Sequence, residues 1–156
     1  MKKLHTYQAA VTWTGNLGTG TDHYRNYSRD YEVTIAHKKM LAGSADPAFR
    51  GDSNKYNPEE LLLSSIASCH LLWYLHLCAD HGVIVEAYTD SATGTMEELS
   101  NGSGHFTEVV LHPIVTVADE TMVTAAKELH VKANTMCFIA NSVKFPVRHQ
   151  AEIKVK

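Results

Sequence analysis

The amino-acid sequence predicts one α+β domain over residues 1–156, and three observations lead to this prediction. Segments with the alternation of β-strands come before, between and after two segments with helical periodicity. The turn-rich connection at residues 97–104 has the length of a hairpin, which favours antiparallel strands. The chain has 156 residues, a usual length for one domain, and no repeat or long linker divides it.

The N-terminal part is predicted to form strands joined by turns. Residues 4–14 and 31–36 both alternate in the way expected of strands with one buried face. Gly15, Gly18 and Gly20 mark a turn region between them, which is consistent with a hairpin. Residues 44–57 have the composition of an irregular loop.

A long helix is predicted from Pro58 to about His81. Asn57 is a suitable cap, proline suits the first helical position, and the two following glutamates complement the positive end of the helix dipole. Gly82 is a suitable stop. The helix is apolar on nearly all sides, so we expect it inside the protein. Serines and histidines within it and acidic flanks disfavour a membrane span. One small sheet cannot cover such a helix, so we expect a homodimer.

The second half of the chain is predicted to contain two long strands, a helix and a last strand. The strands cover residues 83–96 and 105–117. The second helix begins near Asp119 and has apolar residues at helical spacing. In the last strand, residues 147–155, the odd-numbered positions face inward.

Composition excludes several classes of protein. Charged residues make up 20% of the chain, the net charge is −3, and the basic residues are scattered, so we expect neither a nucleic-acid partner nor an anionic membrane partner. The chain has only three cysteines, which argues against a secreted disulfide framework and suits a reducing compartment. The N-terminal segment lacks the apolar region of a signal peptide, so we expect a cytoplasmic protein.

The cysteines are the candidate reactive residues. Cys69 lies within the apolar helix, where a free cysteine is often only a core residue. At about 100° per residue, Cys78 lies on the opposite side of this helix and roughly 13 Å away along its axis, so it cannot form a disulfide with Cys69 and is assigned to the core. Cys137 follows the second helix, and only tertiary folding can bring it to Cys69. From these residues alone, a structural and a reactive role both stay open.

Two segments resemble the motifs of the OsmC/Ohr family (osmotically inducible protein C and organic hydroperoxide resistance protein). Residues 56–69 contain Asn-Pro-Glu-Glu-Leu and end at Cys69, as in the family's first-cysteine motif. Residues 137–142 resemble its second-cysteine motif, although Phe138 stands where the family usually has proline and His70 differs from the best-studied peroxidases. The order of strands and helices also matches, so the resemblance covers nearly the whole chain.

The resemblance implies a thiol-dependent peroxidase that reduces organic hydroperoxides to alcohols without a cofactor or metal. Cys69 would be the peroxidatic thiol, Cys137 would resolve it as a disulfide, and an external dithiol would reduce the pair. Glu59 matches a glutamate that pairs with an arginine. We prefer Arg50 as this arginine, with Arg25 or Arg29 as the alternatives. The resemblance also implies an intertwined homodimer, in which antiparallel sheets wrap the central helices and the active sites lie at the interface.

Three other functions are compatible with part of the sequence. The chain has ten histidines, but it lacks His-Glu-x-x-His, Cys-x-x-Cys and any tight Cys/His cluster, so we expect no metal site. A cysteine hydrolase would pair Cys69 with His70 or His130, but adjacent residues on a helix do not face each other, and no oxyanion-hole signature is present. A non-catalytic redox sensor or a binder of hydrophobic ligands stays as the alternative.

Overall fold

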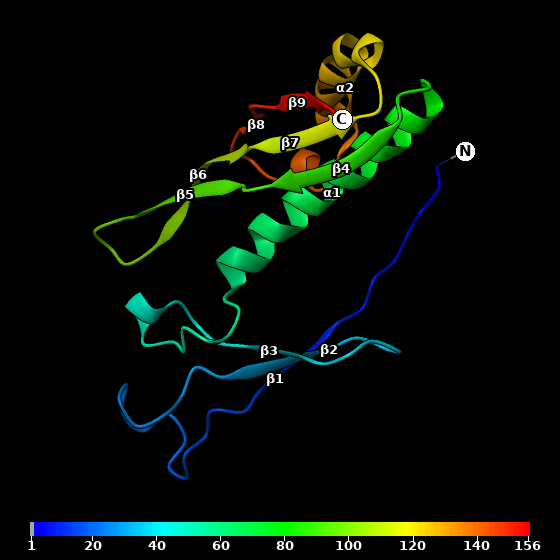
Figure 1. Cartoon of the computed structure of the whole chain (residues 1–156). Helices are drawn as coiled ribbons and strands as arrows, with labels where there is room; N and C mark the ends of the chain where they lie inside the picture. The colour runs from blue at the N-terminus through cyan, green and yellow to red at the C-terminus, as the bar shows by residue number, and fades with distance from the viewer. Residues whose placement is uncertain (1) are drawn as a thin grey trace. The chain divides into compact units, whose positions relative to one another are not determined.

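The computed structural model describes residues 2–156, and its elements have the predicted α+β class (Figure 1). Its contacts divide the chain into two compact units, one ending at Leu61 and the other running from Leu62 to Lys156. The prediction of one domain over the whole chain stays a prediction.

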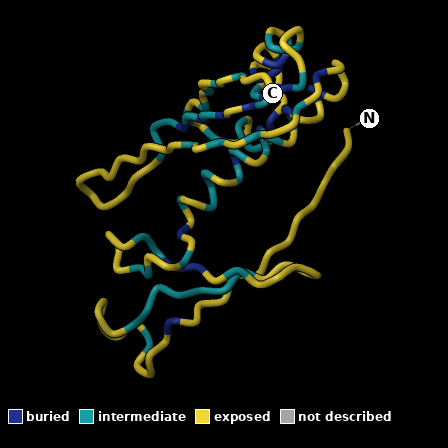
Figure 2. Tube along the Cα trace, viewed as in Figure 1, coloured by how far each residue is buried: buried dark blue, intermediate teal, exposed yellow. Residues whose placement is uncertain are grey.

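The N-terminal unit contains a three-stranded antiparallel sheet in the order β1-β2-β3. Its strands are β1 (Ala10–Trp13), β2 (Tyr31–Thr34) and β3 (Leu41–Gly43). The first strand was predicted over residues 4–14 but covers only Ala10–Trp13. Its partner β2 has four residues, so pairing begins at Ala10 and Thr34. All of β1 is exposed in the single chain (Figure 2). The sequence did not predict β3, which is too short to show alternation.

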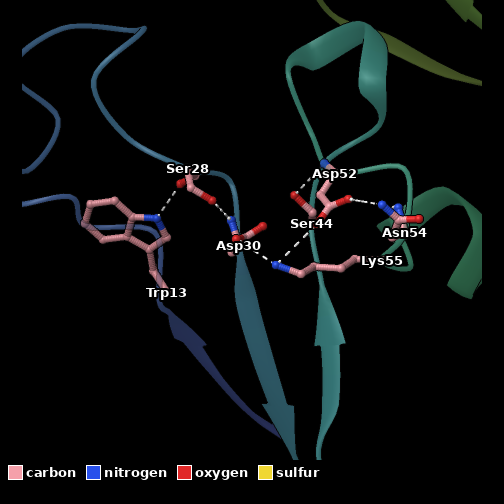
Figure 3. Close-up of polar contacts among 7 residues, drawn as sticks. All are labelled: Trp13, Ser28, Asp30, Ser44, Asp52, Asn54 and Lys55. Carbon is pink, nitrogen blue, oxygen red and sulfur yellow. Dashed lines mark hydrogen bonds and ion pairs between the residues drawn. The ribbon is translucent and has the colours of Figure 1, made fainter.

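The loop between β3 and the first helix is fixed by a polar network (Figure 3). The Lys55 ammonium lies 2.7 Å from the Asp30 carboxylate and 3.6 Å from that of Asp52. The Asp52 backbone N–H donates to the Ser44 hydroxyl at 3.1 Å. The hydrogen bond from Lys55 lowers the pKa of Asp30, so the pair is charged at neutral pH. This loop was predicted as irregular, and it also contains the short 3-10 helix Pro47–Phe49.

Helix α1 (Pro58–Asp80) begins and ends close to where the sequence predicts. The Asn57 side-chain oxygen accepts the Glu60 backbone N–H at 2.8 Å, and the Glu60 carboxylate accepts the Asn57 N–H at 3.1 Å, which forms a capping box. At the other end, Gly82 has φ of 70°. The Val83 N–H donates to the Cys78 carbonyl at 2.9 Å, the arrangement of a Schellman cap.

The C-terminal unit has two sheets, and each long strand predicted from the sequence is divided between them. One sheet has the order β4-β7-β9 and the other β5-β6-β8. Their strands are β4 (Val85–Asp90), β5 (Thr93–Glu98), β6 (Gly104–Leu111), β7 (Pro113–Val117), β8 (Val147–His149) and β9 (Glu152–Val155). The break between β6 and β7 has a local cause. The Asp90 carboxylate accepts the His112 N–H at 2.8 Å, and Pro113 has no N–H for a sheet ladder.

The pairing of these strands confirms the predicted hairpin and adds two parallel contacts. The β5–β6 pair across the 97–104 turn is antiparallel, as is the β4–β7 pair. By contrast, β8 runs parallel to β6, and β9 runs parallel to β7. Parallel neighbours need long connections, and here the chain between β7 and β8 contains the second helix.

The main core of this unit lies between α1, the second helix and β7. Helix α2 (Val123–Met136) follows the 3-10 turn Glu120–Met122. Asp119 caps the start of that turn, because its carboxylate accepts the Thr121 N–H at 2.7 Å. The core consists of Tyr74, Leu77, Cys78, Val83, Val115, Val117, Ala126, Leu129 and Ala133. A smaller cluster consists of Ile66, Val109 and Leu111.

Only one side of α1 is covered within the chain. Its buried residues, spaced by about one turn, are Ile66, His70, Tyr74, Leu77 and Cys78. Leu72 is 67% exposed and Leu75 is 37% exposed. The single chain therefore does not enclose this helix, because α2 and the sheets of the C-terminal unit reach one side only, and the expectation that the helix lies inside the protein depends on a second copy. By length and composition alone, α1 is the one helix in residues 2–156 that could cross a bilayer, and core helices of soluble proteins pass the same test. A second copy covering this side stays a prediction.

Buried histidines link α1 to α2. A ring nitrogen of His70 (Nε2) lies 3.0 Å from one of His130 (Nδ1), and the two rings are parallel within 3°. The His130 ring also stacks on Tyr74 at 3.8 Å between centroids, and the Tyr74 hydroxyl donates to the Ala126 carbonyl at 3.1 Å. Burial lowers the pKa of His70 to about 4 and that of His130 to about 3. Both rings are therefore neutral at physiological pH.

These buried imidazoles predict that the fold loses stability in mild acid. An unfolded histidine binds a proton near pH 6.5, whereas His70 does so only at about 4, so the unfolded state gains protons first as the pH falls. Between pH 7.5 and 5, we expect His70 alone to lower the free energy of unfolding by about 2 kcal/mol. Burial also lowers the pKa of the neighbouring His149, which adds to the effect. Urea denaturation at the two pH values measures the loss.

Two variants test the source of this pH dependence. His130→Phe keeps an aromatic ring on Tyr74 and removes one buried imidazole, so the difference between the two pH values should shrink. His105→Gln, at an exposed position, is the matched control and should leave the difference unchanged. An equal pH dependence in His130→Phe and the wild type would contradict the assignment.

Candidate functional site

The two cysteines that are far apart in the sequence meet in the C-terminal unit. Cys69 lies on α1 and Cys137 is the residue that ends α2. Their side chains are within hydrogen-bonding reach of each other. The histidine pair explains this meeting, since His70 is the residue after Cys69 and His130 lies about two turns before Cys137. Tertiary packing of the two helices thus supplies the proximity that the sequence could not show.

The Cys137 thiol is buried and held by backbone groups. The residue has 0% exposure, and its sulfur accepts the Ala140 N–H at 3.3 Å. Burial raises the pKa of this thiol, and the hydrogen bond with Cys69 raises it further. The N–H groups of Ala140 and Ile139 act in the opposite direction and offset only part of this effect. Cys137 is therefore a protonated thiol at neutral pH.

Cys69 is partly exposed and opens on an apolar pocket of about 480 Å³. The pocket is lined by Ser65, Ser68, Cys69, Leu72, Trp73, His76, Phe138 and Ile139. Apart from the cysteine, its one ionisable lining residue is His76, which lies 3.4 Å from the Asp80 carboxylate. The pocket therefore offers an apolar organic group a place next to a thiol.

Cys78 is part of the core, as predicted. It is 1% exposed and packs in the cluster between α1, α2 and β7. Burial raises the pKa of its thiol. It takes no part in the pair formed by the other two cysteines.

Arg29 is fully used as a structural cross-link in the N-terminal unit. Its guanidinium donates to the Tyr27 carbonyl at 2.6 Å and to the Tyr24 carbonyl at 2.7 Å. The same group lies 4.2 Å from the centroid of each of these tyrosine rings. Arg29 is one of the alternative arginines named from the sequence, but its tyrosine partners were not predicted, although their closeness in the sequence was a usable signal.

Arg50 and Arg25 line one pocket of the N-terminal unit together with Arg29. Arg50 ends the short 3-10 helix with φ of 66°, and its guanidinium lies 5.9 Å from the Tyr24 ring. Among residues 2–156, neither the Arg50 nor the Arg25 guanidinium has a hydrogen bond or an ion pair. Both are thus available to an anion. The approach of either to Cys69, which belongs to the other unit, stays a prediction.

Glu59 occupies a neighbouring pocket of the same unit. It lines this pocket with Arg29, Trp13 and Tyr31, whereas Arg50 does not. One of its carboxylate oxygens (Oε2) is buried and has no hydrogen-bond partner within the described chain. Burial raises the pKa of Tyr31, and the charge of Glu59 raises it to a smaller extent. Glu59 forms no ion pair among residues 2–156, so its pairing with Arg50 stays a prediction.

No group of three or more His, Cys, Asp or Glu side chains in the described residues is arranged to hold a metal ion. The stacked histidines next to Cys69 are hydrogen-bonded to each other instead.

Comparison with known proteins gives one family and a set of similar structures. The model of the family described as OsmC-like protein matches residues 51–152. An OsmC-like protein of unknown function from Vibrio cholerae is 28% identical over 95% of this chain and 99% of that chain, with a TM-score of 0.85. No functionally curated protein matches the sequence.

Two other solved structures share the fold at lower identity. An organic hydroperoxide resistance protein from Elizabethkingia anophelis, with thiocyanate bound, is 18% identical over 100% of both chains, with a TM-score of 0.71. An organic hydroperoxide resistance protein OsmC from Legionella pneumophila is 18% identical over 98% of this chain and 99% of that chain, with a TM-score of 0.70.

The different exposure of the cysteines predicts an order of alkylation. With iodoacetamide at neutral pH, we expect Cys69 to react first, because it opens on the pocket, whereas Cys137 and Cys78 are buried and have raised pKa values. Mass spectrometry of peptides at several times after mixing measures the order. Unfolding in urea is the control and should remove the differences. Faster labelling of Cys137 than of Cys69 in the folded protein would contradict the geometry.

Proposed function

The chain belongs to the OsmC-like protein family, and from this premise we propose that it is a thiol-dependent peroxidase that reduces organic hydroperoxides to alcohols. The observation that carries the proposal is the meeting of Cys69 and Cys137 at an apolar pocket. Two structures with the same fold are organic hydroperoxide resistance proteins, which supports the substrate class.

The first step oxidises Cys69. Its thiolate attacks the terminal oxygen of the hydroperoxide, the one that carries the hydrogen, a sulfur–oxygen bond forms, and the O–O bond breaks. The electron pair of that bond leaves with the alkoxide, which takes a proton from solvent and becomes the alcohol. Cys69 is now a sulfenic acid. Because the pocket beside it is apolar, the organic part of the substrate can lie there while the peroxide meets the sulfur.

The second step forms the Cys69–Cys137 disulfide. The Cys137 sulfur attacks the sulfenic sulfur, the hydroxyl of the sulfenic acid leaves, and the thiol proton of Cys137 goes with it as water. Because its pKa is raised, Cys137 still carries its proton at neutral pH, and this proton moves to the leaving hydroxyl as the sulfur attacks. The Ala140 N–H supports negative charge as it develops on the sulfur.

The cycle closes by reduction and depends on a cation near Cys69. An external dithiol exchanges with the disulfide, which returns both cysteines as thiols and leaves the dithiol oxidised. Arg50, assisted by Glu59, stabilises the Cys69 thiolate, and this role is supported by the Arg50 guanidinium, which forms no hydrogen bond or ion pair among residues 2–156. A homodimer covers the exposed side of α1, and the protein works in the cytoplasm, where thiol reductants are abundant.

Cysteine variants test the cycle. Cys69→Ser should abolish turnover of cumene hydroperoxide with dithiothreitol, because it removes the attacking sulfur. Cys137→Ser should still reduce one equivalent and accumulate a sulfenic acid that dimedone traps. Cys78→Ser is the matched control and should retain most of the activity. Full turnover by Cys69→Ser would sink the proposal. Oxidation of the wild type without cycling would favour the redox sensor or ligand binder.

Arginine variants test which cation serves Cys69. A shift of one pKa unit corresponds to about 1.4 kcal/mol, and one close guanidinium can lower the pKa of Cys69 by this amount. We therefore expect Arg50→Met to lower the kcat/KM for cumene hydroperoxide by about tenfold. Arg29→Met should instead lower the melting temperature, because its guanidinium holds the Tyr24 and Tyr27 carbonyls. Arg25→Met tests the other guanidinium that forms no hydrogen bond or ion pair among residues 2–156. A tenfold loss in Arg25→Met, with none in Arg50→Met, would transfer the role to Arg25.

A further inference from the structure

Each reactive thiol has an aromatic neighbour in the pocket. Trp73 comes one helical turn after Cys69 on α1, and Phe138 directly follows Cys137. Their rings meet edge to face, with centroids 5.6 Å apart and planes at 76°. Both residues line the pocket that holds Cys69. The aromatic pair and the thiol pair are therefore built from the same two places in the fold.

The rest of the pocket gives little support to a charged or strongly polar group. The Ser65 and Ser68 side chains are neutral, and the His76 Nε2 faces the Asp80 carboxylate at 3.4 Å. Phe138 is 69% exposed and Leu72 is 67% exposed, so much apolar surface faces the pocket opening. Covering such surface with an apolar group is favourable by about 25 cal/mol per Å².

We propose that Trp73 and Phe138 determine specificity and select hydroperoxides that carry an aryl group on the peroxide-bearing carbon. This inference rests on the proposed function and names the substrate class of the same site. The pocket volume of about 480 Å³ is that of a usual small-molecule site. A third ring can pack against the pair in the offset or edge-to-face geometry that aromatic groups prefer, which an alkyl group of equal size does not gain.

The position of the aryl group follows from the helix. The four residues from Cys69 to Trp73 rise about 6 Å along α1. A phenyl group bonded to the peroxide carbon lies within this distance when the O–O bond meets the Cys69 sulfur. An aryl group at the far end of a long chain would lie beyond the tryptophan.

Two hydroperoxides that differ by one group test the inference. Cumene and tert-butyl hydroperoxide share the tertiary peroxide and differ only by phenyl in place of methyl. We expect a higher kcat/KM for cumene hydroperoxide, and Phe138→Leu and Trp73→Leu should each lower the cumene to tert-butyl ratio by about three- to tenfold. Leu75→Ala, on the same helix but outside this pocket, is the matched control. An unchanged ratio in both aromatic variants would overturn the inference.

A binding measurement separates the inference from the proposed function. The Cys69→Ser variant is titrated separately with 2-phenyl-2-propanol and 2-cyclohexyl-2-propanol, and NMR measures the affinity for each alcohol. The two alcohols differ in having an aromatic or a saturated ring. Tighter binding of the phenyl compound, lost in Cys69→Ser/Phe138→Leu, supports the inference even if turnover is absent and the peroxidase proposal fails. Equal binding of both alcohols overturns it even if the wild type is an active peroxidase. A change of oligomeric state in Phe138→Leu with an unchanged substrate ratio also overturns it, since the pocket would then be a contact between copies.

Discussion

The contact between α1 and α2 is the constraint on which the site depends. A neutral imidazole has one donor and one acceptor, so His70 and His130 can bond at 3.0 Å only in complementary tautomers. Either choice leaves a nitrogen of each ring without a partner among residues 2–156, at a cost of about 1–3 kcal/mol per group. Stacking on Tyr74 and burial of the surrounding core offset this cost. The helices are thus held in one register, and this register brings Cys69 to Cys137.

In the proposed cycle, the different burial of the two thiols suits their different roles. A nucleophile must reach its substrate, and Cys69 opens on a pocket. In that cycle the resolving thiol acts only on its neighbour, so burial does not hinder its access, and the raised pKa of Cys137 means that its proton moves to the leaving hydroxyl as the sulfur attacks. The turn after α2 prevents this burial from becoming too costly, because the Ala140 N–H is directed at the sulfur.

The sequence predicted correctly those features that are determined by residues close together in the chain. The start and stop of α1 followed from Asn57, Pro58 and Gly82, whose backbone preferences act within a few residues. The division of the long strands was missed, although Pro113 was a local signal for the break between β6 and β7, because the contact of His112 with Asp90 depends on tertiary folding. The approach of Cys69 and Cys137 was available only through resemblance, since helix packing sets it. The histidine pair was missed, because two isolated histidines in a sequence carry no signal of their stacking.

The two sides of α1 have different surroundings, and both contain apolar residues. One side packs in the core and the other lines the pocket. The covered side carries His70 and Tyr74, which bond to α2, and it sets the geometry of the thiols. The other side presents Leu72 and Trp73 around the sulfur of Cys69. A helix with polar residues on that side would have been easier to keep in water, but it would have offered the substrate no apolar surface beside the thiol. In the single chain, this side of α1 therefore leaves apolar surface open beside the Cys69 sulfur.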